Sequence, residues 1–236
     1  MSILAIDTAT QVSSVAVASV DKLAAELTMQ AKLTHSETLM PHIKEVLRMA
    51  NVRKEQLEGI AVSIGPGSFT GLRIGLAAAK AMAYALNLPI VGVSTLKALA
   101  YHYPVLGIRI VSLLDAQKGN AYRESYEWEK GSLHVVNPVE VLPIAEILAE
   151  CAESGREVVL LGDIAARRIR GKVDLPSNVS VAPAHLVMPR AACVAMLGLQ
   201  EFTAGYADNV MNMEPVYIRR SEAEVLWEKR HPEGAK

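Results

Sequence analysis

Alternating apolar and polar positions predict a regular succession of strands and helices in the first hundred residues. Short runs rich in Val, Ala, Ile and Leu, bounded by turn residues, have the length and composition of strands. They cover residues 2–7, 13–18, 23–29, 59–64 and 90–93. Stretches with apolar residues at helical spacing cover residues 34–49, 71–86 and 94–102. The predicted order for residues 1–103 is therefore βββαβαβα.

The second half of the chain repeats this pattern in outline. An apolar run ends at Asp115, as the first strand ends at Asp7, and a turn and a hairpin follow in both halves. Further elements are predicted at residues 108–114, 121–128, 133–136, 143–151 and 157–161, with Asp163 capping a short helix. We therefore expect an α/β fold with two duplicated βββαβα lobes. The predicted division is an N-terminal lobe over residues 1–103, a C-terminal lobe over 104–208 and a C-terminal segment over 209–236.

Composition supports a folded protein with a sizeable core. The chain has 236 residues, of which 51% are hydrophobic, and this excludes intrinsic disorder. The net charge of −1 argues against a protein that binds nucleic acid without a partner. Cys151 and Cys193 belong to no metal-binding pattern, and with no visible signal peptide they indicate a reducing cytoplasm. The most apolar stretch, residues 74–86, contains Lys80 and is too short to cross a membrane.

A glycine-rich loop joins the strand at residues 59–64 to the following helix. One explanation is a tight turn in which Ser68 or Thr70 caps the helix, and the residues alone favour it. The other is an anion site, because small residues let the backbone approach a phosphate and free amides attract it. Arg73 adds weight to the second explanation, since a cation in the first helical turn calls for a negative partner. The loop residues in question are Gly65, Gly67, Ser68 and Thr70.

Two aspartates occupy matching positions at the ends of apolar strands. Asp7, which Thr8 follows, and Asp115 each have a simple explanation, in which the carboxylate caps its own turn. In two-lobed ATPases such turns flank the phosphates of a nucleotide. The two aspartates at matching positions are a stronger indication of such a site than either residue alone. His35 and His42 lie seven residues apart without the carboxylates of a metal motif, so we expect solvated surface histidines. No arrangement typical of a nucleophilic hydrolase is visible.

The helix over residues 71–86 is apolar nearly all round, so it must be covered on several sides. It is either a central core helix or a subunit interface shared with the helix over residues 35–50. In the second case a charge in its small-residue stripe, such as Ala79→Glu, abolishes association without unfolding the chain. The candidate contact residues are Leu39, Ile43, Leu47, Gly71, Gly75, Ala78, Ala79 and Met82.

Several segments resemble the TsaB (YeaZ) family of tRNA threonylcarbamoyladenosine biosynthesis. They are Ile3-Leu-Ala-Ile-Asp-Thr-Ala-Thr, Gly65-Pro-Gly-Ser-Phe-Thr-Gly-Leu-Arg-Ile-Gly, Pro89-Ile-Val-Gly-Val-Ser-Thr-Leu, Asp115-Ala-Gln-Lys-Gly-Asn-Ala-Tyr and Glu214-Pro-Val-Tyr-Ile-Arg. The resemblance runs in order from residue 2 to about residue 220. It implies the two-lobed actin-like (ASKHA) ATPase fold, which agrees with the repeat described above.

The resemblance also implies a role as a partner protein. The catalytic relative TsaD carries metal-binding histidines at the positions of Thr95 and Leu99, neither of which supplies an imidazole. The family therefore implies a non-catalytic subunit without a cofactor or metal of its own. It pairs with TsaD through helices of the N-terminal lobe, works with the ATPase TsaE, and meets tRNA only through the complex. A homodimer is expected when the chain is isolated.

Two other functions stay open at this point. The first is a stand-alone ATP-dependent phosphotransferase that uses Asp7, Thr8 and Asp115 around the phosphates. The second, a metal-dependent peptidase, has the least support.

Overall fold

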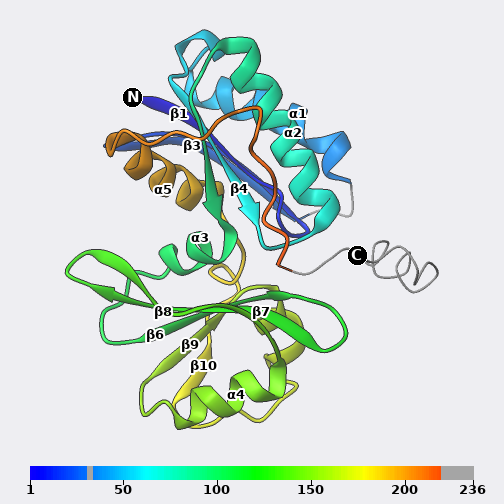
Figure 1. Ribbon diagram of the computed structural model, residues 1–236, viewed down its shortest axis with the longest axis vertical. Coiled ribbons are helices and arrows are strands. Elements are labelled where there is room, and N and C mark those ends of the chain that lie inside the picture. The colour runs from blue at the N-terminus through cyan, green and yellow to red at the C-terminus, as the bar shows by residue number, and fades with distance from the viewer. Residues whose placement is uncertain (31–33, 219–236) are drawn as a thin grey trace, which may run out of the picture.

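Two five-stranded sheets, one from each half of the chain, build the molecule (Figure 1). The computed structural model describes residues 1–30 and 34–218. The first sheet has the order β3-β2-β1-β4-β5 and consists of β1 (Ser2–Asp7), β2 (Val12–Ser19), β3 (Lys22–Gln30), β4 (Gly59–Gly65) and β5 (Ile90–Ser94). The second has the order β10-β9-β6-β7-β8 and consists of β6 (Arg109–Asp115), β7 (Asn120–Glu129), β8 (Ser132–Pro143), β9 (Val158–Leu161) and β10 (Val179–Val181).

The two sheets have the same topology. β1 pairs antiparallel with β2 and parallel with β4, and β6 pairs in the same way with β7 and β9. Read from the hairpin side, the orders β3-β2-β1-β4-β5 and β8-β7-β6-β9-β10 correspond strand for strand. This confirms the predicted duplication. We call the first sheet with its covering helices the first lobe, and the second sheet with its helices the second lobe.

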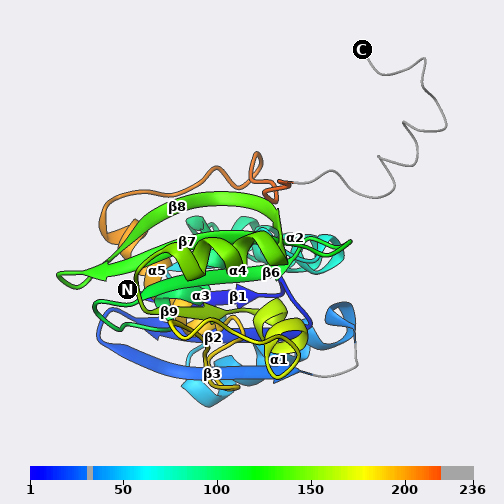
Figure 2. The ribbon, with the colours of Figure 1, turned by 90° about the horizontal axis from the view of Figure 1, so that it is seen from below.

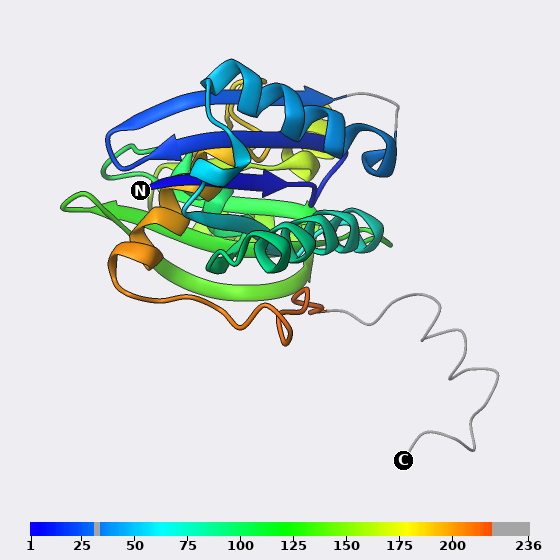
Figure 3. The same ribbon diagram turned by 90° about the horizontal axis from the view of Figure 1, so that it is seen from above.

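Helices cover both faces of the first sheet. α1 (His35–Ala50) and α2 (Phe69–Leu86) lie side by side on one face, as Figure 3 shows, and α5 (Ala191–Thr203) covers the other. α3 (Thr95–Tyr101) lies between the sheets and packs on the second one. The outer face of the second sheet is covered by α4 (Ile144–Glu153) and the π-helical turn η2 (Ala165–Ile169), and Figure 2 shows α4 across it. A short 3₁₀ helix, η1 (Lys54–Gln56), precedes β4.

Helix α5 lies in the second half of the chain but belongs in space to the first lobe. Its residues fall in the range predicted for the C-terminal lobe, yet it packs against β1, β2 and β4 of the first sheet. Small side chains allow the close approach: a Cβ at Gly198 would lie 2.5 Å from the Cβ of Ala61. A division that assigns residues 104–208 to the C-terminal lobe would separate α5 from the sheet that it covers. The predicted domain division stays a proposal.

Candidate functional site

The loops that follow β1 and β4 meet at the carboxyl ends of these two strands. Thr8 Oγ1 donates a hydrogen bond of 2.8 Å to the carbonyl of Gly71, and the amide of Ser68 donates one of 2.7 Å to the carbonyl of Ala9. This is expected because β1 and β4 are parallel neighbours whose carboxyl ends share an edge. The structure therefore brings Asp7 and Thr8 together with the glycine-rich loop.

The glycines of this loop and of the first turns of α2 face the chain itself. A Cβ at Gly67 would lie 2.3 Å from the carbonyl oxygen of Ala9, and one at Gly71 only 2.1 Å from that of Thr8. A Cβ at Gly75 would lie 2.2 Å from Thr8 Oγ1. No side chain fits there, so these glycines let α2 pack on the end of β1.

Ser68 caps helix α2, as the simpler explanation of the loop predicted. Its Oγ accepts a hydrogen bond of 3.2 Å from the amide of Gly71, and its carbonyl accepts one of 2.8 Å from Leu72. The amides of Ser68, Gly71 and Leu72 are thus already bound within the chain. Thr70, the other predicted cap, lies exposed on the first turn of the helix.

Aromatic rings, rather than a carboxylate, receive the Arg73 guanidinium within the described residues. The guanidinium carbon lies 3.8 Å from the centroid of the Phe69 ring, and Nε donates a hydrogen bond of 3.0 Å to Tyr217 Oη. The two rings pack with centroids 4.9 Å apart. Cation–π contact and the tyrosine hydroxyl oxygen supply the negative potential that the sequence led us to expect from an anion.

Asp7 and Asp115 occupy matching strand ends but different surroundings. Each caps its own turn, since Oδ1 of Asp7 accepts from the amide of Ala9 at 3.0 Å and Oδ1 of Asp115 accepts from that of Gln117 at 2.8 Å. Asp7 is 1% exposed, and its Oδ2 has no hydrogen-bond partner among the described residues. Burial therefore raises the pKa of Asp7 to about 6, against the opposing effect of the Ala9 amide.

The carboxylate of Asp115 is instead partly exposed and forms an ion pair. Its Oδ2 lies 3.3 Å from Arg168, and its amide donates to Asp163 Oδ1 at 3.1 Å. The two carboxylate oxygens of Asp163, which was predicted to cap a short helix, accept instead from this amide and, at 2.5 Å, from Arg167. Asp115 and Asp163 are thus each compensated by an arginine of η2.

The two histidines of α1 are bound to the β1–β2 loop and to the start of β2, so the prediction of solvated surface histidines is wrong. His42 is 7% exposed, and its Nδ1 lies 3.0 Å from Ser13 Oγ. Nε2 of His35 lies 2.7 Å from the carbonyl oxygen of Thr10. Burial lowers the pKa of His42. The sequence held a signal for this, because His42 shares its helical face with the apolar Leu39.

Many of the predicted contact residues on α1 and α2 are core residues of the first lobe. Leu39 and Ile43 are each 2% exposed, Ala79 is fully buried, and Gly71 and Gly75 pack on β1. Their side chains pack inside the lobe, and their assignment to a partner interface stays a prediction. Leu47, Ala78 and Met82 are only partly buried. The exposed positions of α2 are Thr70, Arg73, Ala77, Ala81, Tyr84 and Ala85.

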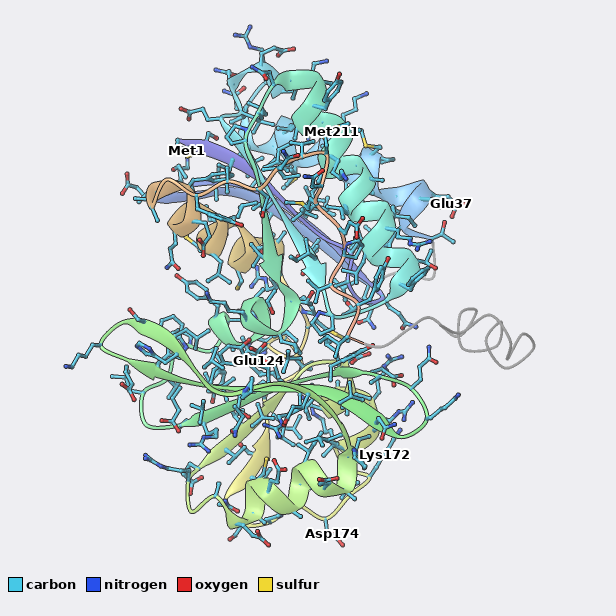
Figure 4. All side chains as sticks on the ribbon, viewed as in Figure 1. Met1, Glu37, Glu124, Lys172, Asp174 and Met211 are labelled. Atoms are coloured by element: carbon cyan, nitrogen blue, oxygen red, sulfur yellow. The ribbon has the colours of Figure 1, made fainter. Side chains whose placement is uncertain are left out.

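Sequence reasoning missed a segment that returns from α5 to lie along α2. Lys80 Nζ donates hydrogen bonds to the carbonyls of Met211 and Met213 at 3.1 and 2.9 Å, and Figure 4 shows Met211 beside α2. Met213 is 8% exposed and belongs to the core between α2 and the sheet. No periodic pattern marks this segment. Within the predicted C-terminal segment 209–236, residues from Arg219 onward lie outside the described part.

Two classes of site are not found in the described part of the chain. Residues 1–30 and 34–218 hold no group of three or more His, Cys, Asp or Glu placed to bind a metal ion. No helix among them is long and apolar enough to span a membrane. Thr95 and Leu99 are both fully buried in α3.

Comparisons with known proteins agree on one family. The family model described as "TsaD: tRNA N6-adenosine threonylcarbamoyltransferase" matches residues 27–227. The tRNA threonylcarbamoyladenosine biosynthesis protein TsaB of Bacillus subtilis is 32% identical over 230 residues, covering 96% of this chain and 98% of that protein. TsaB of Escherichia coli is 30% identical over 233 residues, with 97% and 98% covered.

Solved structures support the same fold. YeaZ from Pseudomonas aeruginosa superimposes with a TM-score of 0.76 at 23% identity, covering 92% of this chain and 99% of that one. The ethanolamine utilization protein EutJ from Carboxydothermus hydrogenoformans gives 0.50 at 14% identity, with 83% and 89% covered. These likenesses confirm the actin-like two-lobed fold.

Proposed function

Since this chain belongs to the TsaB (YeaZ) family and acts in the threonylcarbamoyladenosine modification of tRNA, we propose that it is the non-catalytic partner of a TsaD transferase. In this role it stabilises or activates TsaD, and the transfer to adenosine takes place on TsaD. The ATPase TsaE completes the complex, and tRNA is held mainly by the other subunits. The net charge of −1 supports that division of labour.

The observation that carries the proposal is an apolar outer surface on two neighbouring helices. On α2, Ala77, Ala81 and Tyr84 are exposed, Tyr84 by 75%, and Ala78 and Met82 are partly exposed beside them. On α1, large apolar side chains also reach the solvent, with Met40 at 54% and Met49 at 51%. Apolar surface of this kind, concentrated on adjacent helices, is typical of a protein interface. We call it the docking face, and it consists of Met40, Leu47, Met49, Ala77, Ala78, Ala81, Met82 and Tyr84.

The burial of Thr95 and Leu99, where the catalytic relative carries its metal-binding histidines, supports the non-catalytic assignment. Thr95 and Leu99 are fully enclosed in α3, so neither presents a donor atom to a cleft. A leucine side chain has no metal-binding atom at all. The chain therefore depends on TsaD for the metal chemistry.

A stand-alone phosphotransferase is the weaker alternative. It uses free amides around the start of α2, and three of these, from Ser68, Gly71 and Leu72, already donate within the chain. It also requires an accessible Asp7, and that carboxyl group is 1% exposed. No described feature favours a peptidase.

The test is to place a charge on the docking face without disturbing the core. Ala81→Glu introduces a carboxylate at an exposed position of α2. We expect it to weaken binding to the TsaD of the same organism at least tenfold in titration calorimetry, about 1.4 kcal/mol. Ala152→Glu, the same change at an exposed position of α4, is the matched control and should bind normally.

Light scattering on the isolated chain extends the test to the homodimer. If two copies pair through the docking face in the absence of TsaD, Ala81→Glu is monomeric and Ala152→Glu dimeric. Normal TsaD binding by Ala81→Glu would show that the docking face is wrongly assigned. Failure of the parent chain to bind TsaD at all would refute the partner role itself.

A further inference from the structure

Arg73 is held in a fixed position without a carboxylate partner in the described part of the chain. Its Nε donates a hydrogen bond of 3.0 Å to Tyr217 Oη, and its guanidinium carbon lies 3.8 Å from the centroid of the Phe69 ring. Nη1 and Nη2, which carry most of the guanidinium donors, make no hydrogen bond to any described residue. Since Arg73 is exposed, these donors are accessible to another molecule. Other arginines of the described part pair with carboxylates, namely Arg48, Arg109, Arg123, Arg167, Arg168 and Arg190.

Two aromatic rings from distant parts of the chain fix the guanidinium of Arg73. Phe69 is the first residue of α2, and Tyr217 lies on the segment that returns from α5 along α2, as Figures 1 and 3 show. The two rings pack with centroids 4.9 Å apart, and the amide of Val216 donates to the carbonyl of Ile64 at 2.8 Å, which holds the neighbouring Tyr217 in place. A side chain fixed in this way has already lost rotamer freedom that binding would otherwise cost.

Arg73 lies on the same face of α2 as the docking face. Ala77 and Ala81 follow it at intervals of four residues, and all three positions are exposed. Between Arg73 and Tyr84 the helix rises about 16 Å, at about 1.5 Å per residue. A typical protein interface buries about 800 Å² on each partner, which corresponds to a disc about 32 Å across. An interface of ordinary size centred on the docking face therefore includes Arg73.

The surroundings of Arg73 fit a single carboxylate better than the backbone of an RNA. The docking face carries no charged residue, and Lys80, the other cation of α2, donates to the carbonyls of Met211 and Met213. An RNA backbone is bound by several cations along one surface. One isolated guanidinium instead matches a carboxylate, with which it forms two parallel N–H···O bonds.

We propose that Arg73 is the polar anchor of the docking face, and that it binds an aspartate or glutamate side chain of the TsaD partner in a bidentate ion pair. This inference rests on the proposed function, since it names the chemistry of the partner at one point of the same face. Apolar contacts supply area but little direction, whereas a bidentate pair fixes how the partner is oriented. Phe69 and Tyr217 are positioning residues that keep the guanidinium ready for this contact.

Titration calorimetry with the full-length chain and the TsaD of the same organism tests the ion pair. Arg73→Gln removes the charge and keeps an aliphatic stem against Phe69, and we expect it to bind TsaD at least about tenfold more weakly. The affinity of the parent should fall between about 0.05 M and about 0.5 M salt, and that of Arg73→Gln should fall less. Tyr217→Phe keeps the ring but removes the acceptor for Nε, so it should weaken binding by a smaller factor.

Arg156→Gln is the matched control. Arg156 is exposed between α4 and β9 of the second lobe, and only its backbone takes part in hydrogen bonds within the described residues. This variant should bind TsaD as the parent does and keep the salt dependence of the parent.

An exchange of charges identifies the partner side chain. Arg73→Glu should abolish binding, and replacement of one acidic residue on the TsaD surface by arginine should restore it. Normal binding by a folded Arg73→Gln chain overturns the proposal, and so does the failure of every such TsaD variant to rescue Arg73→Glu. If thermal melting shows that Arg73→Gln is unfolded, Tyr217→Phe decides, and an unchanged affinity overturns the proposal.

Two further outcomes separate this proposal from the function on which it rests. A parent chain that does not bind TsaD refutes the partner role, and the anchor with it. Normal binding between the two proteins, with weaker binding of transcribed tRNA to the complex that contains Arg73→Gln, overturns the carboxylate partner and assigns Arg73 to RNA.

Discussion

Replacing Asp7 by asparagine should stabilise the protein at neutral pH. The carboxyl group is buried, and one of its oxygens has no partner among the described residues. Its pKa rises from 3.8 to about 6, a shift of about two units. Each unit corresponds to about 1.4 kcal/mol, so the ionised group costs the folded state about 3 kcal/mol. An asparagine of the same shape keeps the acceptor for the Ala9 amide and buries no charge.

The sign of the pH dependence follows from the direction of the shift. Because the folded state binds the proton more tightly than the unfolded state, the protonated carboxyl contributes its stability fully below a pH of about 4. That contribution is lost as the pH rises from about 4 to about 6, the pKa of Asp7 in the folded chain. The asparagine variant does not titrate. Its advantage should therefore be greatest above pH 6 and vanish near pH 4.

Urea unfolding at about pH 8 and about pH 4, extrapolated to water, measures the free energy of unfolding of each chain at the two pH values. Subtracting wild type from variant at each pH cancels the other titrating groups. Asp115→Asn is the matched control, since its carboxylate is partly exposed and faces Arg168, and it should give no gain. An advantage of Asp7→Asn that is absent at about pH 8, or equal at both pH values, would refute the reasoning.

Three further predictions concern the first lobe. Ala79→Glu should unfold the chain or lower its melting temperature sharply, because position 79 is fully buried and an unpaired charge there has no partner. Gly75→Ala should destabilise by more than about 1 kcal/mol, since its Cβ would lie 2.2 Å from Thr8 Oγ1, and a Thr8→Ala background should recover part of the loss in a double-mutant cycle. Burial lowers the pKa of His42, so the stability that its neutral form contributes is present above pH 6.5 and is lost as the pH falls below it. His42→Gln should therefore show a smaller drop in melting temperature than wild type between about pH 7 and about pH 5.

The sequence predicted most elements of the fold because local patterns determine them. β8 is the instructive exception, since it extends from Ser132 to Pro143 while the pattern indicated only residues 133–136. Pro138 interrupts the alternation, and a proline is tolerated there because β8 is an edge strand with a free side. Edge position is a property of the sheet and is not visible in the local sequence.

Long-range partners account for the errors at the candidate site. The spacing of Gly71, Gly75 and Ala79 correctly indicated a close approach, but not that the approaching group is the end of β1 rather than another helix. The segment that follows α5 binds Lys80 through the carbonyls of Met211 and Met213, which every residue type offers, so no side-chain pattern predicts these bonds. The prediction for His42 is wrong because its partner, Ser13, lies on β2, 29 residues earlier in the chain.

The carboxyl ends of β1 and β6 explain why we place the function on the outside of the molecule rather than between the lobes. The two strands match in topology, but Asp7 is enclosed without a counterion in the described structure, whereas Asp115 is paired with Arg168. An anion entering here would first have to displace bonds such as that from the Ser68 amide to Ala9, each worth about 1 kcal/mol. It would then bring negative charge towards a carboxyl group whose ionisation burial already opposes. The duplicated architecture therefore favours use as a rigid support for the docking face on α1 and α2.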